Sequence, residues 1–148
     1  MNTHPYLRAF LAGVFVPTMV LPVMLAGFIV VRFVLQVPFP IERGLVFPMA
    51  LVPSLWGLWN MLWLGSNTRT HLHIGPHGAL LPFLMLPAGT LVATSLGILV
   101  LGADGVTWFQ SSHVPYALIA PAFLAAIAGY YLIWKYVVGF VNRVMGIA

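Results

Sequence analysis

Three histidines, His71, His73 and His77, lie close together in this chain. Neutral imidazole is the commonest protein ligand for zinc, copper and nickel, so this cluster predicts a metal or redox site as one alternative. No acidic or cysteine side chain lies nearby to complete a coordination shell, and Gly75-Pro76 interrupts a regular i, i+4 face. The favoured interpretation of the segment is therefore a solvated loop, and no cofactor is predicted.

Asn60 is the most informative polar residue within the apolar segments. An amide left unpaired in hydrocarbon costs several kcal/mol, so we expect Asn60 to bond to another helix or to a carbonyl freed by a proline. The alternative is a contact with a ligand in a cavity. Thr90 and Thr94 are also polar residues of an apolar segment, and each is expected to bond back to its own i−4 carbonyl.

Side chains for acid–base or nucleophilic catalysis are scarce. Glu42 and Asp104 are the only acids, and neither falls in an apolar segment, so paired carboxylates and intramembrane proton relays cannot be assembled. Ser111, Ser112 and His113 could join Asp104 in a Ser–His–Asp arrangement, but their spacing is that of an ordinary polar turn. With no cysteine, thiolate chemistry is excluded as well. The pattern favours a protein without catalytic activity.

The composition indicates a membrane protein. Hydrophobic residues make up 61% of the 148 residues, and the mean hydropathy is +1.03. Charged residues make up 5%, against about a quarter in an ordinary soluble domain. The net charge of +4 comes from basic residues spread singly along the chain rather than clustered, so nucleic-acid binding is not expected.

Four long apolar stretches follow one another with short loops between them. About 20 apolar residues are needed for a helix to cross a bilayer. The predicted spans are about 10–35, 44–65, 78–102 and 114–138. We therefore predict a single all-α domain over residues 1–148, a bundle of four transmembrane helices with antiparallel neighbours.

Each stretch carries a pair of prolines, namely Pro17/Pro22, Pro48/Pro53, Pro82/Pro87 and Pro115/Pro121. The second proline of each pair lies deep enough to remove a backbone hydrogen bond, so we expect kinked helices. The regular offset of the pairs fits an internal repeat. It fits equally well the plain period of one span and one loop.

The basic residues predict the orientation. Placing both termini in the cytoplasm puts Arg8, Arg69, Lys135 and Arg143 inside and leaves Arg32 and Arg43 outside, and this excess agrees with the positive-inside rule. The apolar run that begins the chain is too long for the core of a signal peptide, so a retained first span is expected. Lys135 follows an aromatic segment that contains Trp134, and these residues, like Trp63, are expected to anchor the protein at the membrane interface.

Small residues spaced along two spans predict helix contacts. They are Gly89, Ala93 and Gly97 in the third span, and Ala122, Ala126 and Gly129 in the fourth. Such stripes let helix backbones approach closely in lipid, so we expect a tight antiparallel hairpin between these two spans. Trp56, on the second span, is expected to fill space between helices.

Three functions are open at this point. The favoured hypothesis is a small membrane protein that acts by helix packing, as a homo-oligomer or as an accessory subunit of a membrane complex. The first alternative is a channel or carrier for a neutral or amphiphilic solute, lined by Asn60 and by proline-freed carbonyls. The second alternative is the metal or redox site at the three histidines. The expected partners are the lipid bilayer and other membrane subunits.

Overall fold

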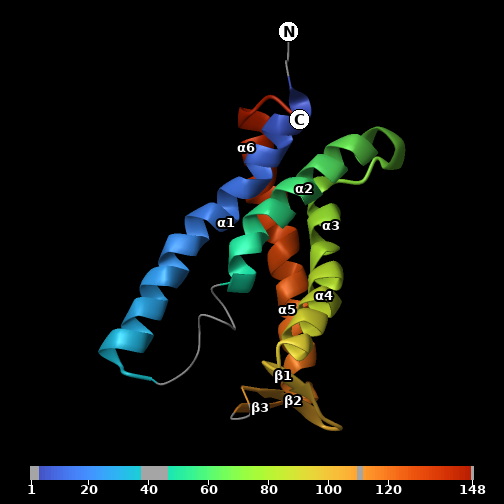
Figure 1. Cartoon of the computed structure of the whole chain (residues 1–148). Coiled ribbons are helices and arrows are strands. Elements are labelled where there is room, and N and C mark those ends of the chain that lie inside the picture. Colours follow the sequence, from blue (N-terminus) through green and yellow to red (C-terminus); the bar gives the residue numbers. More distant parts are fainter. Residues whose placement is uncertain (1–3, 38–46, 110–111, 148) are drawn as a thin grey trace.

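The fold is mostly helical with one small sheet, as a computed structural model of the chain shows (Figure 1). The structure describes residues 4–37, 47–109 and 112–147. The helical elements are α1 (Pro5–Ile29), η1 (Val30–Val34), α2 (Phe47–Thr70), α3 (Ile74–Ala79), α4 (Leu81–Ser95), α5 (Tyr116–Leu132), η3 (Ile133–Val138) and α6 (Gly139–Val144). The strands are β1 (Leu99–Leu101), β2 (Gly105–Trp108) and β3 (Ser112–Pro115). The prediction of a purely all-α protein is therefore wrong.

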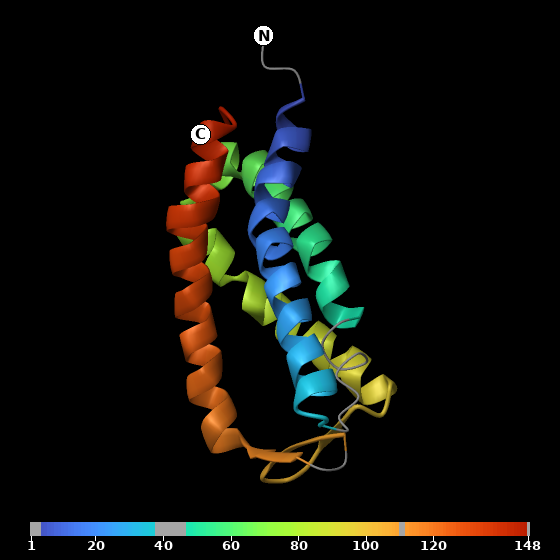
Figure 2. The same cartoon turned by 90° about the vertical axis from the view of Figure 1, so that its left-hand side faces the viewer.

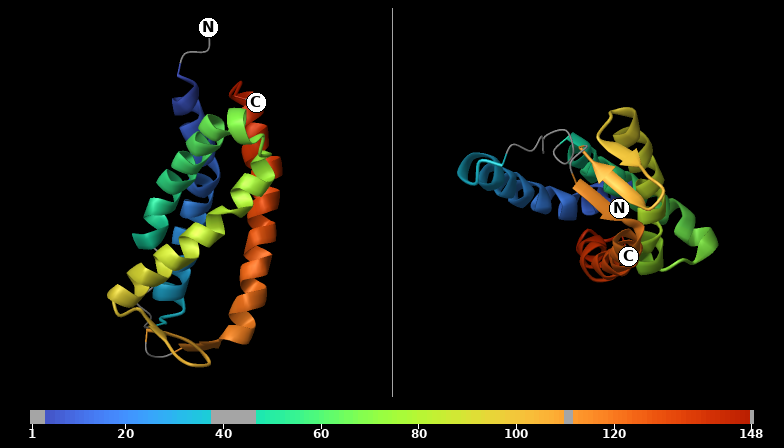
Figure 3. Two further views of the ribbon diagram at one scale, coloured as in Figure 1. Left: turned by 90° about the vertical axis from the view of Figure 1, so that its right-hand side faces the viewer. Right: turned by 90° about the horizontal axis from the view of Figure 1, so that it is seen from below.

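The helices run up and down between two ends of the molecule. Helix α1 leads away from the end that holds both termini, and α2 returns to it (Figure 1). The pair α3 and α4 then runs to the sheet, and α5, η3 and α6 run back beside α3 to the end with the termini (Figures 1 and 2). The far end of α1 lies apart from α5 and from the sheet (Figures 1 and 3).

Three helical segments are long and apolar enough to cross a membrane, by length and composition. They are Pro5–Val34, Ile74–Ser95 and Tyr116–Val144. These correspond to the predicted spans 10–35, 78–102 and 114–138, with shifted ends. The predicted span 44–65 corresponds to α2, although residues 44–46 lie outside the described part of the chain. Helix α2 is not among the three segments, because its tryptophans, its prolines and Asn60 lower its mean hydropathy.

Helix α4 ends at Ser95, seven residues before residue 102, where the third predicted span ends. Gly97 adopts a left-handed backbone with φ of 66°, which an L side chain rarely takes. The Gly97 N–H donates to the Thr94 carbonyl at 3.1 Å and the Ile98 N–H donates to the Ala93 carbonyl at 2.9 Å, the two bonds of a Schellman motif. Gly97 therefore terminates a helix and does not belong to a packing stripe.

The residues after this turn form an antiparallel sheet in the order β1-β2-β3. Leu99 pairs with Trp108, and Thr107 pairs with His113. Leu99 and Val106 point to the same face and are buried, while Leu101, on that face at the end of β1, is exposed. The β-branched and aromatic residues of this segment suit a pleated, half-buried surface, so the stretch predicted as helix end and loop forms a cap on α4 and α5 instead.

Helix contacts occur at glycines other than the predicted ones. A Cβ at Gly13 of α1 would lie 2.5 Å from the Trp56 carbonyl oxygen and 2.9 Å from the Gly57 Cα of α2. On α3, a Cβ at Gly78 would collide with the Trp134 side chain. The absence of a side chain at these positions lets α1 cross α2, and lets α3 lie against η3.

The predicted small-residue hairpin is not found within the described part of the chain. A Cβ at Gly89 of α4 or at Gly129 of α5 would meet no atom within 4 Å. The other small residues of the two stripes are not among the buried residues either, namely Ala93, Ala122 and Ala126. The two helices meet instead through larger side chains, such as the rings of Phe83 and Phe123, whose centroids lie 5.2 Å apart. Rings of this size hold the two backbones apart.

The core is a cluster of large side chains in the half of the molecule that holds the termini. Trp56, Leu81, Trp134 and Val138 are its buried members. Trp56 thus fills space between helices as expected, whereas Trp134 is fully buried and is not an interface anchor.

The π-helical segment η3 aligns the inward face of the last helix. Trp134, Val138 and Asn142 are each fully buried and are spaced four residues apart. Four residues of an α-helix turn through about 400°, so such a line would drift by about 40° at each step. The wider π turn reduces this drift and keeps the three side chains on one face.

The prolines occupy the predicted positions within the helices. Pro82 lies in the first turn of α4, and Pro115 precedes α5 as its N-cap residue. Pro53, Pro87 and Pro121 lie inside helices, as do Pro17 and Pro22.

Candidate functional site

A buried pair of asparagines joins three helices near the termini. Asn60 of α2 and Asn142 of α6 are both 0% exposed. The Asn60 Nδ2 donates to the Asn142 Oδ1 at 2.8 Å and to the Ala9 carbonyl of α1 at 2.7 Å, and the Asn142 Nδ2 donates to the Asn60 Oδ1 at 3.1 Å. Asn60 thus makes the interhelical bonds that the sequence predicts for it. Because its nitrogen and its oxygen are both bonded inside the protein, it is not a free group lining a cavity.

Thr94 makes the bond to its own i−4 carbonyl that the sequence predicts, because its hydroxyl donates to the Thr90 carbonyl at 2.8 Å. This bond satisfies the hydroxyl within its own helix.

A second polar contact connects α2 to α3 through His77 and Trp59. The Trp59 Nε1 donates to the His77 carbonyl at 2.9 Å, and the His77 Nε2 lies 3.0 Å from the Trp59 carbonyl. The two rings stack with centroids 4.7 Å apart. The Nε2 therefore carries the proton in this contact, since only an N–H can bond to a carbonyl oxygen.

The histidine segment differs from the predicted solvated loop. His77 is buried inside α3, and Pro76 lies in the first turn of that helix, where its missing N–H has no partner to lose. His71 and His73 are exposed. Among the described residues, no group of three His, Cys, Asp or Glu side chains is placed to hold a metal ion. Metal binding by His71, His73 and His77 stays a prediction, and it would require His77 to leave Trp59.

Trp63 is also buried rather than placed as an exposed interface anchor. Its Nε1 donates to the Leu72 carbonyl at 2.9 Å, which ties the end of α2 to the segment that follows it. Sequence reasoning misses this role because a tryptophan near the end of a span is usually an anchor.

The core aromatic side chains form a continuous group. The Trp56 ring lies 5.4 Å from the Trp134 ring and 5.2 Å from the Tyr130 ring, measured between centroids. The Tyr130 hydroxyl approaches the Met85 sulfur at 3.5 Å. The indole nitrogens of Trp56 and Trp134 are buried without a hydrogen-bond partner in the described part of the chain. These aromatic side chains stabilise the core through their large apolar area and through contacts between their rings.

The two ends of the chain are joined by Arg8. Its Nη1 donates to the Met145 carbonyl at 2.6 Å, just beyond the end of α6. A guanidinium at the C-terminal end of a helix satisfies a carbonyl that has no intrahelical partner and complements the negative end of the helix dipole. Arg8 thus fixes α1 beside α6 at the same end as the asparagine pair.

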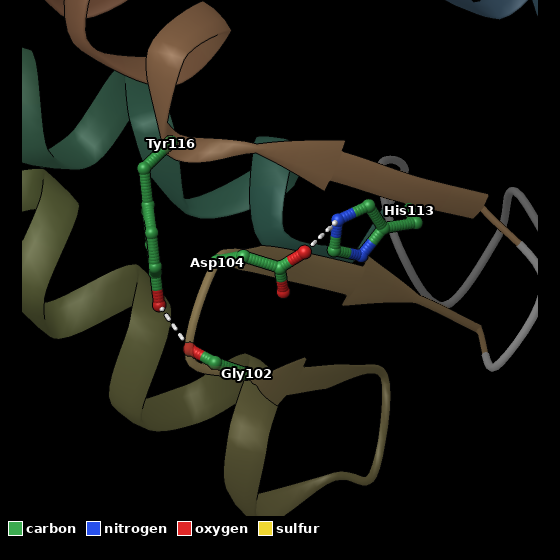
Figure 4. A network of polar contacts seen from close by, with 4 residues as sticks. All are labelled: Gly102, Asp104, His113 and Tyr116. Carbon is green, nitrogen blue, oxygen red and sulfur yellow. Dashed lines mark hydrogen bonds and ion pairs between the residues drawn. The ribbon is translucent and has the colours of Figure 1, made fainter.

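A polar contact lies on the exposed side of the sheet. The His113 Nε2 lies 3.5 Å from the Asp104 Oδ2, and both side chains are exposed, at 46% and 82% (Figure 4). The Tyr116 hydroxyl donates to the Gly102 carbonyl at 3.0 Å, and this closes the turn against the start of α5. Asp104 and His113, which a Ser–His–Asp arrangement would need, do meet, but Ser112 is the neighbour of His113 in β3 and points to the opposite face. Ser111 lies outside the described residues.

Basic side chains gather toward the end that holds the termini. The Lys135 Nζ lies 5.4 Å from the centre of the Tyr131 ring and 5.2 Å from that of the Tyr136 ring. Lys135, Arg143 and Arg69 are all exposed. Lys135 therefore lies among aromatic rings, as the sequence predicts.

Comparisons with protein-family models, with curated proteins and with solved structures find no match to this chain.

Proposed function

We propose that this chain is an integral membrane protein whose four helical passes act as a packing unit, either in a homo-oligomer or as an accessory subunit of a membrane complex. The buried side chains of Asn60, Asn142 and His77 bond inside the protein, while its apolar helix surfaces face outward. Leu91 and Val23, for example, are each 71% exposed. Such side chains suit a lipid solvent, and a soluble monomer rarely exposes apolar patches of this extent.

The lengths of the helices support the membrane assignment. Pro5–Val34 has 30 residues and Tyr116–Val144 has 29, which correspond to about 45 Å of helix against about 30 Å of hydrocarbon. Arg8 and Arg32 lie near the two ends of the first segment, where long basic side chains reach the headgroups. Helix α2 is the remaining pass, the second in chain order, and it returns the chain to the end that holds the termini.

The depth of the asparagine pair follows from its partners. Asn60 bonds to the carbonyl of Ala9, the neighbour of Arg8 in the chain. The pair therefore belongs to the level of the headgroups rather than to the centre of the bilayer. At this level it fastens α1, α2 and α6 together.

The proposed orientation puts both termini in the cytoplasm, together with Arg8, Arg69, Lys135 and Arg143. The sheet, with Asp104, then lies on the opposite side of the membrane. Prolines inside α1, α2, α4 and α5 are proposed to bend these helices, since each removes one backbone hydrogen bond.

The observation that carries the packing function is the open space at Gly89 and Gly129. Helix interiors disfavour glycine by about 1 kcal/mol relative to alanine, and no contact among the described residues requires glycine at either position. Another helix could approach closely at both positions because neither has a side chain.

The test is the assembly state of the purified protein in mild detergent, measured by native mass spectrometry and cross-linking. Gly89→Leu and Gly129→Leu should reduce the assembled species. Gly27→Leu serves as the matched control: a Cβ at Gly27 of α1 would likewise meet no atom within 4 Å, but Gly27 has valine four residues to either side and is not part of a small-residue stripe. A wild-type protein that is strictly monomeric and has no co-purifying partner would overturn the proposal. Equal losses in all three variants would remove α4 and α5 as the contact surface.

A further inference from the structure

The backbone around Asp104 holds this residue in place on the sheet. Asp104 lies in the turn between β1 and β2, where the Gly102 N–H donates to the Gly105 carbonyl at 2.8 Å. The Asp104 carbonyl accepts the Tyr116 N–H at 3.1 Å, so the start of α5 holds the same residue as well. The carboxylate is therefore carried by a turn that is closed by one backbone bond and tied to α5 by another.

The His113 ring reaches this turn across a glycine. His113 of β3 pairs with Thr107 of β2, so their side chains point to the same face. A Cβ at Gly105 would lie 2.8 Å from the His113 Cε1, which is too close for a real side chain. The absence of a side chain at Gly105 therefore leaves room for the ring, which presents its Nε2 to the Asp104 carboxylate (Figure 4).

The distance between the two facing atoms is informative. The His113 Nε2 lies 3.5 Å from the Asp104 Oδ2. A charge-assisted N–H···O bond is shorter, about 2.7–2.9 Å. Tetrahedral zinc lies about 2.0–2.1 Å from a histidine nitrogen and about 2.0–2.2 Å from a carboxylate oxygen, so two such ligands are about 3.4 Å apart. The spacing of the pair thus fits two ligands of one zinc ion better than it fits a direct hydrogen bond.

The chemistry of the two donors selects the metal. Imidazole suits zinc, copper and nickel, whereas Mg²⁺ takes oxygen ligands in octahedral geometry, where neighbouring ligands lie about 2.9 Å apart. No lysine or arginine occurs between residues 96 and 115, so no basic residue of this segment competes for the carboxylate. Both side chains are exposed, so an ion from solvent can reach them and water can complete its coordination.

We propose that Asp104 and His113 bind a zinc ion, with water at the two remaining coordination positions. The ion joins β3 to the turn before β2, beside the bond from the Tyr116 hydroxyl to the Gly102 carbonyl. It therefore stiffens the sheet that caps α4 and α5. In the proposed orientation the site lies on the side of the membrane opposite to the termini, but the binding itself depends neither on that orientation nor on helix assembly.

The experiment measures zinc binding to the full-length protein in mild detergent, by competition with a fluorescent zinc indicator. The wild type should bind zinc saturably, and excess Mg²⁺ should not displace it. Asp104→Asn and His113→Gln should each lower the zinc affinity about tenfold or more, since even changes outside the coordination shell cost that much. Asp104→His restores a zinc ligand without the negative charge, so it should bind zinc at least about tenfold more tightly than Asp104→Asn.

His73→Gln is the matched control. His73 is likewise exposed, but it lies beyond α2 at the end that holds the termini, away from the sheet (Figure 1). This variant should bind zinc as the wild type does. A loss as large as that in His113→Gln would overturn the site and assign the zinc to the histidines near α3.

Other results would also overturn the zinc site. They are the absence of saturable binding by the wild type, an unchanged affinity in Asp104→Asn and His113→Gln, and displacement of zinc by Mg²⁺. Binding by Asp104→His no tighter than that by Asp104→Asn would show that the pair acts only as an ion pair. Each of these results would leave the proposed packing function standing, because the assembly state is measured separately.

Discussion

Replacing the buried asparagines one at a time and together probes the polar contact that joins α1, α2 and α6. Asn60→Leu keeps the number and branching of the side-chain heavy atoms, but the Asn142 Nδ2 and Oδ1 both lose the partner that the structure gives them. In Asn142→Leu the Asn60 Oδ1 loses its partner, while the Asn60 Nδ2 keeps the Ala9 carbonyl. The first change should therefore cost more stability than the second.

The magnitudes follow from the number of groups left unpaired. A buried donor or acceptor without a partner costs about 1–3 kcal/mol. We expect a loss of about 3 kcal/mol in the free energy of unfolding for Asn60→Leu and about 2 kcal/mol for Asn142→Leu. With both residues changed to leucine, no side-chain amide remains to be left unpaired. The double variant should therefore lose no more than about 2 kcal/mol, which is a strong non-additivity.

The assay is reversible unfolding in mixed micelles by added sodium dodecyl sulfate, followed by tryptophan fluorescence. Trp56 and Trp134 are buried in the core that α2 and the last helix share, so their fluorescence reports on the packing of these helices. A double variant that loses the sum of the two single losses would refute the coupling between the two amides. An Asn60→Leu variant as stable as the wild type would refute the contribution of the pair to stability.

Three further changes test the helix contacts and the helix end. Gly78→Ala should lower stability by several kcal/mol or prevent folding, because the added Cβ collides with Trp134; thermal unfolding in detergent measures this. Gly97→Ala should lower the unfolding free energy by about 1 kcal/mol, since φ there is 66°; chemical unfolding checks it, and no loss would contradict the Schellman turn. His77→Phe keeps the ring stack on Trp59 but loses the Nε2 bond, so a loss of about 1 kcal/mol is expected in the same unfolding assay, and a gain would count against the bond.

Much of the helical part can be predicted from hydropathy alone. Long apolar runs have few other stable structures, so the sequence predicts the helices containing Pro17, Pro87 and Pro121 in nearly the right places. It also predicts the interhelical role of Asn60, because a polar amide among apolar residues must find a partner. It does not predict which partner, since Asn142 lies 82 positions later in the chain and nothing local connects the two.

The sheet and the histidine segment could not be predicted, for two physical reasons. Leu99, Val100 and Leu101 are as apolar as the helix before them, so periodicity alone does not separate a short buried strand from a continuing helix. Gly97 is a signal for the turn, but a glycine there also fits a packing stripe. The sequence favours a loop around His77 because a glycine followed by a proline usually breaks a helix, whereas in α3 this pair begins one.

The π turn in η3 sets the phase of everything that follows it in the chain. With the same residues wound as an ordinary α-helix, the eight steps from Trp134 to Asn142 would turn through about 800°, which is about 80° past two full turns. The amide of Asn142 would then turn away from its partner, and Arg143 would leave the side of the helix that it shares with Lys135. The wide turn therefore keeps Asn142 in phase with the bonds that join α1, α2 and α6, although Asn142 itself lies outside the turn.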